Sequence, residues 1–344
     1  MAERIKAVLV GCGGIAGAWL GAVSEMDDVE MVGFVDLIEE SARKRAEEFG
    51  WKDAPVGTRM GEMLERTKPD VVFDCTVPEA HVQVTLEALE HGCHVLGEKP
   101  LADSMANARK MVEAARKAGR IYAVIQNRRY HEPIRRLRAF LESGAIGPVT
   151  TVNSDFYIGA HFGGFRDRME HVLLLDMAIH TFDAARLISG RDPVAVYCKE
   201  WNPSGSWYDH DASAHAIFEM TDGVVYSYRG SWCAEGCNTS WECDWRIVGE
   251  KGSVTWDGGE RFRVEVATKT GGFFSEREER EIPPLGPQAR VGGHAGVIRH
   301  FLDAVKAGVE PETVCADNIK SLSMVFGAVQ SAEKGQKVAI GGAV

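Results

Sequence analysis

A glycine-rich turn near the N-terminus constrains the fold of this chain more than any other feature. Residues 11–16 read Gly-Cys-Gly-Gly-Ile-Ala and match the pattern G-x-G-x-x-G/A, directly after the apolar run 5–10, which predicts a strand. Here Gly11 permits a tight turn, Gly13 lets a pyrophosphate approach the backbone, and Ala16 lets the following helix pack closely on the strand. The N–H groups at the helix start attract the phosphate charge. The cofactor-binding residues expected in this turn are Gly11, Gly13, Gly14, Ile15 and Ala16.

An acidic residue ends the second predicted strand. Residues 29–35 are mostly apolar, and Asp36 follows them. A carboxylate at this place accepts hydrogen bonds from both ribose hydroxyls of a dinucleotide and repels a 2′-phosphate. The sequence therefore predicts NAD as the cofactor, in preference to NADP.

Strand-like and helix-like segments alternate through the first third of the chain. This alternation predicts a doubly wound parallel sheet of the Rossmann type, with helices on both faces. Asp103 is the expected N-cap of its helix. The further strands are expected at 71–75, 94–96 and 121–125, and the helices at 15–26, 39–49, 78–91 and 103–118.

The rhythm changes after about residue 127. Two helices and then a series of strand-like segments separated by turn residues predict a second, α+β domain with a large, mostly antiparallel open sheet. We expect a first domain over 1–126 and a second over 127–344, with the C-terminal helix packing back on the first. The helices are expected at 131–142, 170–189, 295–306 and 316–334, and the strands at 194–201, 212–220, 224–232, 241–248 and 261–268.

Composition excludes several classes of protein. The 344 residues are 45% hydrophobic, which is ordinary for a globular chain of roughly two domains. The 50 acidic against 39 basic residues give a net charge of −11, which argues against nucleic acid and anionic membrane surfaces as partners. No apolar run approaches the ~18 residues of a membrane span, and the start of the chain reads as a strand rather than a signal peptide.

Cysteine usage favours a reducing compartment and no metal. Eight cysteines are too dilute for a disulfide scaffold, so we expect a cytoplasmic protein. The spacing of Cys233, Cys237 and Cys243 matches no familiar zinc set, and we expect no metal site.

Polar residues follow several predicted strands of the first domain. Thr76, Glu98-Lys99-Pro100 and Gln126-Asn127 stand at such ends, and the carboxyl ends of a doubly wound sheet line one crevice. Pro100 restricts Lys99 to extended backbone conformations. An ammonium beside an anionic cofactor can donate a proton or a hydrogen bond to a substrate oxygen. The alternative is a solvated loop lysine.

A carboxylate and an imidazole share one face of a predicted helix. Asp176 and His180 are four residues apart in segment 170–189, which is apolar nearly all round and should be buried. Buried polar groups need partners, and a network of substrate hydroxyls would supply them. A histidine is also suited to proton transfer near neutral pH. The alternative is an Asp–His pair tied into internal structure, with Asp183 as a further structural partner.

Taken together, these motifs resemble the glucose-fructose oxidoreductase / inositol dehydrogenase / rhizopine-catabolism (Gfo/Idh/MocA) family of NAD(P)-dependent oxidoreductases. The resemblance covers essentially the whole chain. It is carried by the turn 11–16, by Cys-Thr-Val-Pro-Glu-Ala-His at 75–81, by Glu98-Lys99-Pro100 and by Asp176-x-x-x-His180. It implies that Lys99, Asp176 and His180 are the catalytic residues. It also implies that Thr76, Pro78, His81, Glu98, Lys99 and Asn127 contact the cofactor, with Arg128 near the nicotinamide.

The resemblance also implies a mechanism. His180, oriented by Asp176, takes the hydroxyl proton while hydride leaves for nicotinamide C4, and Lys99 hydrogen-bonds the same oxygen. The residues leave open whether Lys99 or His180 is the base. Met169-Glu170-His171 stands where many members have glycine-rich sequence, and His171 is expected to add a substrate contact. The expected substrate-binding residues are Lys99, Arg128, Tyr157, Arg166, His171, Asp176 and His180.

Aromatic and charged residues mix in segments 155–168 and 201–211, which suits a polyhydroxylated ring. An aromatic rim or subunit contact is the alternative, and Arg166 could instead meet a substrate carboxylate. We expect an NAD-dependent dehydrogenase that oxidises a small aldose at C1 to a lactone, or a ring hydroxyl of a sugar or cyclitol. Competing hypotheses are an NAD-using glycosidase and a non-catalytic cofactor sensor. A homodimer or homotetramer through the second-domain sheet is expected, as in the family.

Overall fold

The computed structural model describes residues 4–340, and their contacts divide the chain into two units. The first unit comprises residues 4–130 together with Arg290–Leu322. The second comprises His131–Ala289 and residues 323–340. This division differs from the predicted boundary after residue 126. The later segment, Arg290–Leu322, returns to the first unit. At its start, the Tyr130 carbonyl accepts the N–H groups of Gly292 and Gly293, at 2.8 and 3.2 Å.

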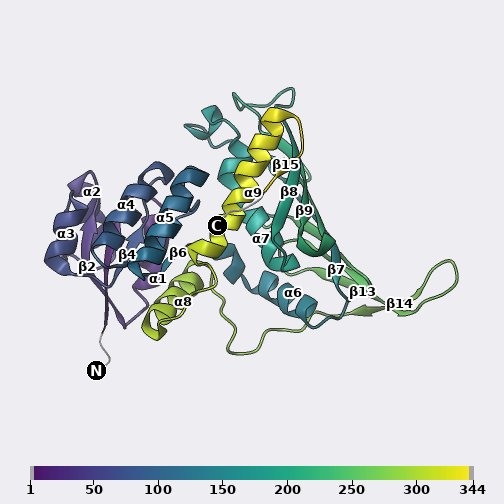
Figure 1. The fold of residues 1–344 in the computed structure, drawn as a ribbon, viewed down its shortest axis with the longest axis horizontal. Coiled ribbons are helices and arrows are strands. Elements are labelled where there is room, and N and C mark those ends of the chain that lie inside the picture. Colours follow the sequence, from purple (N-terminus) through teal and green to yellow (C-terminus); the bar gives the residue numbers. More distant parts are fainter. Residues whose placement is uncertain (1–3, 341–344) are drawn as a thin grey trace. The chain divides into compact units, whose positions relative to one another are not determined.

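The first unit is a doubly wound sheet (Figure 1). Its six strands are all parallel, in the order β3-β2-β1-β4-β5-β6. This is the strand order of a dinucleotide-binding Rossmann domain. The strands are β1 (Ile5–Val10), β2 (Val29–Val35), β3 (Val56–Gly57), β4 (Val71–Asp74), β5 (His94–Gly97) and β6 (Tyr122–Val124).

Helices cover both faces of this sheet, because a parallel sheet is apolar on both sides. On one face, apolar residues of α1, α2 and α8 join a single core with the strands. On the other, α4 packs against α3 and α5. The helices are α1 (Ala16–Val23), α2 (Glu39–Glu48), α3 (Met60–Thr67), α4 (Pro78–Glu90), α5 (Met105–Ala118), the 3-10 helix η1 (Asn127–Tyr130), α8 (His294–Ala307) and α9 (Cys315–Lys334), which continues into the second unit.

The predicted N-cap of α5 is wrong by one residue. Ser104 is the cap, because its hydroxyl accepts the Asn107 N–H at 3.2 Å. Asp103 instead accepts the side-chain amide of Asn107 at 2.7 Å. Both side chains therefore bind the first turn, but only Ser104 satisfies a backbone donor there.

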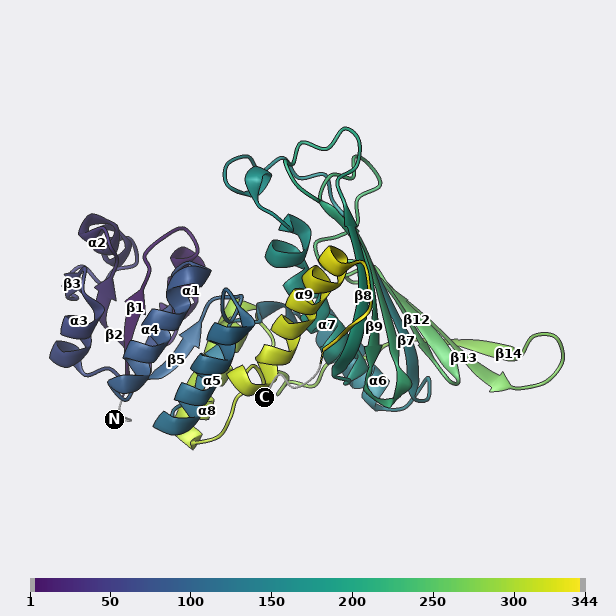
Figure 2. The same ribbon diagram turned by 45° about the horizontal axis from the view of Figure 1, so that its top comes forward.

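The second unit is built on a nine-stranded sheet (Figure 2). The order is β14-β13-β12-β11-β7-β10-β9-β8-β15, and only the β7–β10 pair is parallel. The predicted fold class, a Rossmann domain followed by a mostly antiparallel open sheet, is confirmed. The strands are β7 (Val149–Tyr157), β8 (Pro193–Trp201), β9 (Ser213–Met220), β10 (Val225–Ser231), β11 (Asp244–Gly249), β12 (Gly252–Trp256), β13 (Phe262–Lys269), β14 (Glu276–Arg280) and β15 (Val338–Ala339).

One face of the large sheet carries the core of the second unit. Side chains alternate between buried and exposed along β9, so the inner face packs on helices while the outer face meets solvent. Figures 1 and 2 both show α7 against one face of the sheet. The helical elements are α6 (Glu132–Glu142), the 3-10 turns η2 (Arg166–Arg168) and η4 (Thr221–Gly223), the π-helix η3 (Leu173–Ala178) and α7 (Ile179–Ser189).

The predicted helix over 170–189 begins about two residues later than expected, and its first part is π-helical rather than α-helical. His171 has a φ of +52°, a left-handed conformation that cannot be part of a right-handed helix. The segment that follows, Leu173–Ala178, is π-helical, and only Ile179–Ser189 is an α-helix. Asp176 therefore lies on a π turn, and His180 lies on the first turn of α7.

Candidate active site

The glycine-rich turn leaves open space beside the backbone. A Cβ atom on Gly11 would lie 2.7 Å from the Cys75 carbonyl, and the φ of Gly11 is +88°, so only glycine fits there. A Cβ atom on Gly13 or Gly14 would meet no atom within 4 Å. The turn is thus close-packed against the end of β4 on one side and open on the other, as a bound phosphate group requires.

The Asp36 carboxylate is fixed at the end of β2. Its Oδ2 accepts the Cys12 N–H at 2.8 Å, and its Oδ1 accepts the Ile38 N–H at 2.9 Å. Each oxygen keeps a further lone pair for a ligand hydroxyl. Asp36 therefore presents a negative charge to the open side of the turn and also anchors the turn itself.

A cation that the sequence analysis did not single out holds the same turn. Arg45 on α2 donates to the Gly13 carbonyl at 2.9 Å and to the Cys12 carbonyl at 3.5 Å. It also pairs with Glu48 at 2.7 Å. No local motif signals this role, because Arg45 lies in a charged helix that looks like a solvated surface.

A cavity of about 780 Å³ lies against this turn. Asp36 and Thr76 line it, and so do residues from the start of α3 and from α4 that sequence reasoning missed. The helix α3 was not predicted from the sequence, although its apolar residues Met60, Met63 and Leu64 lie on one buried face, a helical pattern that could have identified it. These further lining residues are Leu37, Thr58, Arg59, Met60, Gly61, Glu62, Val77, Ala80, Gln83, Val84 and Glu87.

Glu98 is buried and held on both of its oxygens. Its Oε1 accepts the indole N–H of Trp19 at 2.8 Å, and its Oε2 accepts the Lys99 N–H at 3.0 Å. Trp19 lies on α1, the helix that opens at the glycine turn, and is fully buried. One hydrogen bond therefore ties α1, which follows the glycine turn, to the carboxylate that precedes Lys99.

The segment 74–81 is organised around a buried aspartate. Asp74 Oδ1 accepts the Thr76 N–H at 3.0 Å and the Thr76 hydroxyl at 2.6 Å. Pro78 begins α4, as expected for a first helical position. His81 is fully buried, and its ring contacts the carbonyls of Thr76 and Pro100. His81 therefore contacts the backbone of Thr76 and Pro100, and these two segments, rather than its own ring, lie on the side where the cofactor is expected.

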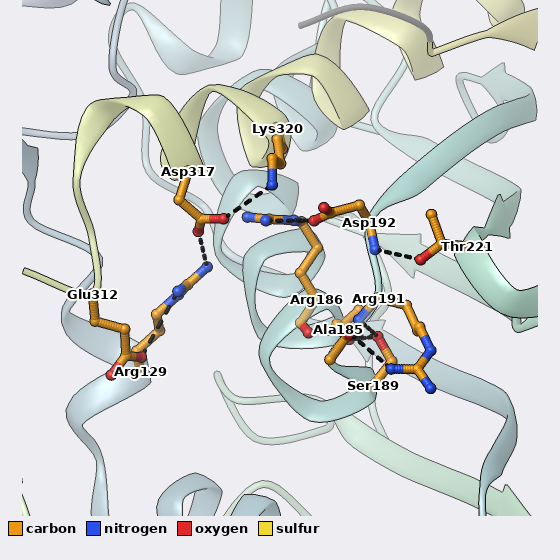
Figure 3. Close-up of polar contacts among 11 residues, drawn as sticks. Arg129, Ala185, Arg186, Ser189, Arg191, Asp192, Thr221, Glu312, Asp317 and Lys320 are labelled. Atoms are coloured by element: carbon orange, nitrogen blue, oxygen red, sulfur yellow. Dashed lines mark hydrogen bonds and ion pairs between the residues drawn. The ribbon is translucent and has the colours of Figure 1, made fainter. Parts of the chain in front are cut away.

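Asn127 and Arg128 lie on η1, directly after β6. The next residue, Arg129, is buried and pairs with Asp317 at 3.4 Å and with Glu312 at 3.7 Å (Figure 3). Tyr130 bonds His300 across 2.7 Å. These contacts fix η1, and with it Asn127 and Arg128, at the end of the last strand. Sequence reasoning missed them because the partners are far away in the chain.

In the second unit, Arg166 binds Asp176. Its Nε donates to Oδ2 at 2.8 Å and its Nη2 to Oδ1 at 3.3 Å. The guanidinium also lies over the rings of Phe162 and Phe165, at 5.0 and 4.8 Å. The bond to Asp176 raises the pKa of Arg166 above its usual value. Asp176 is therefore the anion of an ion pair and sits on a π turn, a feature frequent at functional sites.

His171 pairs with Glu200 of β8. Its Nδ1 lies 2.6 Å from Glu200 Oε2, and its Nε2 lies 3.7 Å from Glu333 Oε1. Hydrogen bonding to Glu200 raises the pKa of His171, and burial raises the pKa of Glu200. This pairing anchors the residue just before the π turn, which is a different use of His171 from the expected substrate contact.

Tyr157 ends β7, a strand that sequence reasoning did not identify. Its N–H donates to the Thr239 hydroxyl at 3.1 Å, and burial raises the pKa of its phenol. Lys99 and Asn127 belong to the first unit, whereas Tyr157, Asp176 and His180 belong to the second. The convergence of the two sets on one substrate stays a prediction.

Two features are absent from residues 4–340. No group of three or more His, Cys, Asp or Glu side chains in this part of the chain is arranged to hold a metal ion. Within the same residues, no helix is both long and apolar enough to cross a bilayer.

Two family models match the chain, one in each half. Residues 5–126 match the model described as oxidoreductase family, NAD-binding Rossmann fold. Residues 134–255 match the GFO/IDH/MocA C-terminal domain. The chain belongs to the Gfo/Idh/MocA oxidoreductase family. The resemblance drawn from the motifs is thereby confirmed, and the chain is an NAD-binding oxidoreductase of this family.

Several relatives of this chain within the Gfo/Idh/MocA family are named after sugar substrates. A D-apiose dehydrogenase of Paraburkholderia graminis is 27% identical over 98% of this chain and 90% of its own. A 1,5-anhydro-D-fructose reductase of Ensifer adhaerens is 26% identical over 96% and 97%. An oxidoreductase from Agrobacterium radiobacter, solved in complex with NAD+, L-tartaric acid and magnesium, superposes with a TM-score of 0.85. It is 24% identical over 98% of this chain and 99% of its own, and it shows the Gfo/Idh/MocA fold.

Proposed function

We propose that this chain is an NAD-dependent dehydrogenase that oxidises a hydroxyl of a small neutral sugar or cyclitol. The observation that carries the proposal is the cavity of about 780 Å³ that the glycine turn and Asp36 line. Gly13 and Gly14 leave room for the pyrophosphate, and Asp36 offers lone pairs to the ribose hydroxyls. When bound, NAD accepts a hydride from the carbon that bears the substrate hydroxyl.

The preference for NAD over NADP rests on the fixed position of Asp36. Because both of its oxygens accept backbone N–H groups, the carboxylate cannot swing away from a 2′-phosphate without breaking the glycine turn. Arg59 also lines the cavity, but it pairs with Glu62 at 3.1 Å. We therefore expect a clear preference for NAD.

The proposed chemistry divides three roles among the side chains. Asp176 is held by Arg166, so it serves as a hydrogen-bond acceptor and not as a proton donor. His180, on the following turn, takes the proton of the substrate hydroxyl, and Lys99 donates a hydrogen bond to the same oxygen. The opposite assignment of base and donor, with Lys99 as the base, fits the same residues.

The proposed substrate class is neutral. The guanidinium of Arg166 already neutralises Asp176, so it offers no free cation to a substrate carboxylate. The relatives named above act on D-apiose and 1,5-anhydro-D-fructose, which are uncharged. Oxidation of an aldose at C1 to a lactone and oxidation of a ring hydroxyl are the two reactions to distinguish.

The test is a panel of aldoses, polyols, inositols, sugar acids and glycosides, each with NAD and with NADP, followed by the absorbance of the reduced nicotinamide. We expect a neutral sugar or inositol to reduce NAD to NADH, at a rate well above that of NADP reduction. Faster turnover with NADP would overturn the role given to Asp36. Cleavage of a glycoside without net NADH would favour an NAD-using glycosidase instead.

We also propose a cytoplasmic location and a homodimer or homotetramer formed through the large sheet. All eight cysteines are free thiols, which supports a reducing compartment. The outer face of the sheet exposes Tyr197 and Ile217, which supports an interface between copies of the chain.

A further inference from the structure

The strongest unassigned feature of the first unit is the environment of His81. This residue lies in the first turns of α4 and has no exposed surface. Its Nδ1 lies 3.0 Å from the Pro100 carbonyl oxygen, and its Nε2 lies 3.2 Å from the Thr76 carbonyl oxygen. Both ring nitrogens therefore face oxygens that accept hydrogen bonds and cannot donate them.

The number of ring protons decides whether these two contacts are favourable. A neutral imidazole carries one N–H and one lone pair, so it can donate to only one of the two carbonyls. The other contact would set a nitrogen lone pair against an oxygen lone pair in a dry interior, where a polar group without a hydrogen-bond partner is destabilising. An imidazolium donates to both carbonyls.

A buried cation requires a compensating anion. The carboxylate of Asp74 at the end of β4 acts on His81 through its charge and not through a hydrogen bond, because both ring nitrogens face carbonyl oxygens. Asp74 has no exposed surface, and its Oδ1 accepts two hydrogen bonds from Thr76, which is the role of a carboxylate. Burial raises the pKa of Asp74, and the charge of His81 and the bonds from Thr76 oppose that rise. The other titratable groups next to Asp74 are the Cys75 thiol and the Tyr122 phenol, and burial raises the pKa of each.

We propose that His81 is a doubly protonated imidazolium, paired with Asp74, and that this buried pair is the brace that positions the two cofactor-side segments at Thr76 and Lys99. The Lys99 backbone is then held on both sides. Glu98 Oε2 accepts its N–H at 3.0 Å, and the carbonyl of the next residue, Pro100, accepts from His81. His81 is a positioning residue and does not touch the substrate.

The direct test is nuclear magnetic resonance of the full-length protein with ¹⁵N-labelled histidine rings at neutral pH. The His81 signals are assigned by their loss in His81→Gln, or through backbone connectivity if that variant does not fold. We expect protons on both ring nitrogens of His81. One proton on the ring in the wild-type protein would overturn the proposal, and this result does not depend on any substrate being known.

The charge pair is tested with two variants at Asp74 and Thr76. Asp74→Asn removes the anion, and we expect His81 to lose one ring proton. Thr76→Val removes only the hydrogen bond from the Thr76 hydroxyl to Asp74, and it replaces Asp74→Asn if that variant does not fold. In Thr76→Val we expect a smaller fraction of the His81 rings to carry two protons. A ring that stays fully protonated in the folded variants would overturn the pairing with Asp74.

The positioning role is tested by hydrogen exchange and NAD affinity. His81→Leu removes both donors, whereas His81→Gln keeps amide N–H groups. We expect His81→Leu to speed exchange in peptides covering 75–80 and 98–103 and to weaken NAD binding about tenfold, with His81→Gln closer to wild type. If the two variants show equal exchange rates and equal NAD affinities, His81 only fills space, and its positioning role is overturned. Ring protonation, hydrogen exchange and NAD affinity are all measured without a substrate, so these tests remain valid even if no sugar in the panel is oxidised.

Discussion

At the scale of single residues, the chemistry proposed for this chain depends most on Lys99. Its N–H is held by Glu98, and Pro100 follows it in the segment that His81 contacts. The backbone around this ammonium is therefore fixed by buried groups, although the residue itself ends a short strand. Such preorganisation is what makes a single hydrogen-bond donor effective toward a developing charge.

We expect Lys99→Ala to lower turnover by about 10²–10³-fold, because one donor to the reacting oxygen is lost. NAD binding should persist, since the glycine turn and Asp36 are untouched. Steady-state kinetics together with NAD titration would measure both. Lys110→Ala, an exposed lysine of α5, is the matched control. Turnover near that of wild type would contradict the role of Lys99.

At the scale of elements, the hydrogen bond from Trp19 to Glu98 couples α1 to the end of β5. Trp19→Phe keeps an aromatic ring but removes the indole N–H, which leaves a buried carboxylate oxygen without its donor. A hydrogen bond to a charged group is worth about 1.5–3 kcal/mol. We expect a loss of that order in the free energy of unfolding by urea, and weaker NAD binding.

Trp51→Phe is the control for Trp19→Phe, because Trp51 packs against the same core and makes no contact with Glu98. Both variants lose indole area, but Trp51 is only partly buried whereas Trp19 is fully buried, so the unfolding free energies are read together with the NAD affinities. Equal unfolding free energies and equal NAD affinities in the two variants would contradict the coupling of α1 to β5.

A second element-scale contact is the pair between His171 and Glu200, which anchors the start of the π turn. The pKa of His171 is raised by its bond to Glu200, and the pKa of Glu200 is raised by burial. Both groups bind protons more tightly in the folded state than in the unfolded state. The contribution of His171 to stability is therefore present below its unfolded pKa of about 6.5 and is lost as pH rises through its folded pKa. The contribution of Glu200 is lost over a lower range, which begins at the unfolded carboxyl pKa of about 4.3.

We expect the thermal midpoint of the wild type to fall as pH rises above about 6.5, and His171→Asn to flatten this dependence. Calorimetry across that range would measure it. His210→Asn, which changes an exposed histidine, should keep the wild-type slope. If His171→Asn keeps that slope too, the pair does not govern this part of the pH profile.

At the scale of the whole molecule, the outer face of the large sheet is the surface that we propose as the interface between copies of the chain. Tyr197 of β8 and Ile217 of β9 are directly opposite each other and are 46% and 52% exposed. Val194 and Val225 extend this apolar area. A second apolar patch, Phe273 and Phe274, lies between β13 and β14. Exposed patches of this kind mark interfaces between proteins.

We expect a homodimer or homotetramer in sedimentation equilibrium, with its interface on the β8–β9 face. Ile217→Asp should shift the population toward monomers, because a carboxylate would be buried there without a partner. The double variant Phe273→Ser and Phe274→Ser should leave the assembly intact. A monomeric wild type would contradict the expected assembly, and dissociation only in the double variant would move the interface to the β13–β14 hairpin.

The sequence by itself determined the order of most strands and helices in the first unit, the glycine turn, the acidic end of β2 and the mostly antiparallel character of the second sheet. These features are local. Hydrophobic periodicity and turn residues act within a few positions, so they can be read along the chain. Three elements were not predicted: the two-residue β3, the short helix α3 despite its amphipathic pattern, and β7, which lies between β10 and β11 in the sheet.

Only the tertiary structure decided which polar groups are partners. Asp176 and His180 looked like a pair on one helix, yet Asp176 lies on a π turn and binds Arg166. His171 binds Glu200, and Glu98 binds Trp19, across long stretches of chain. A buried polar side chain takes whichever partner the packing of strands and helices brings within reach, and no spacing along the chain encodes that distance.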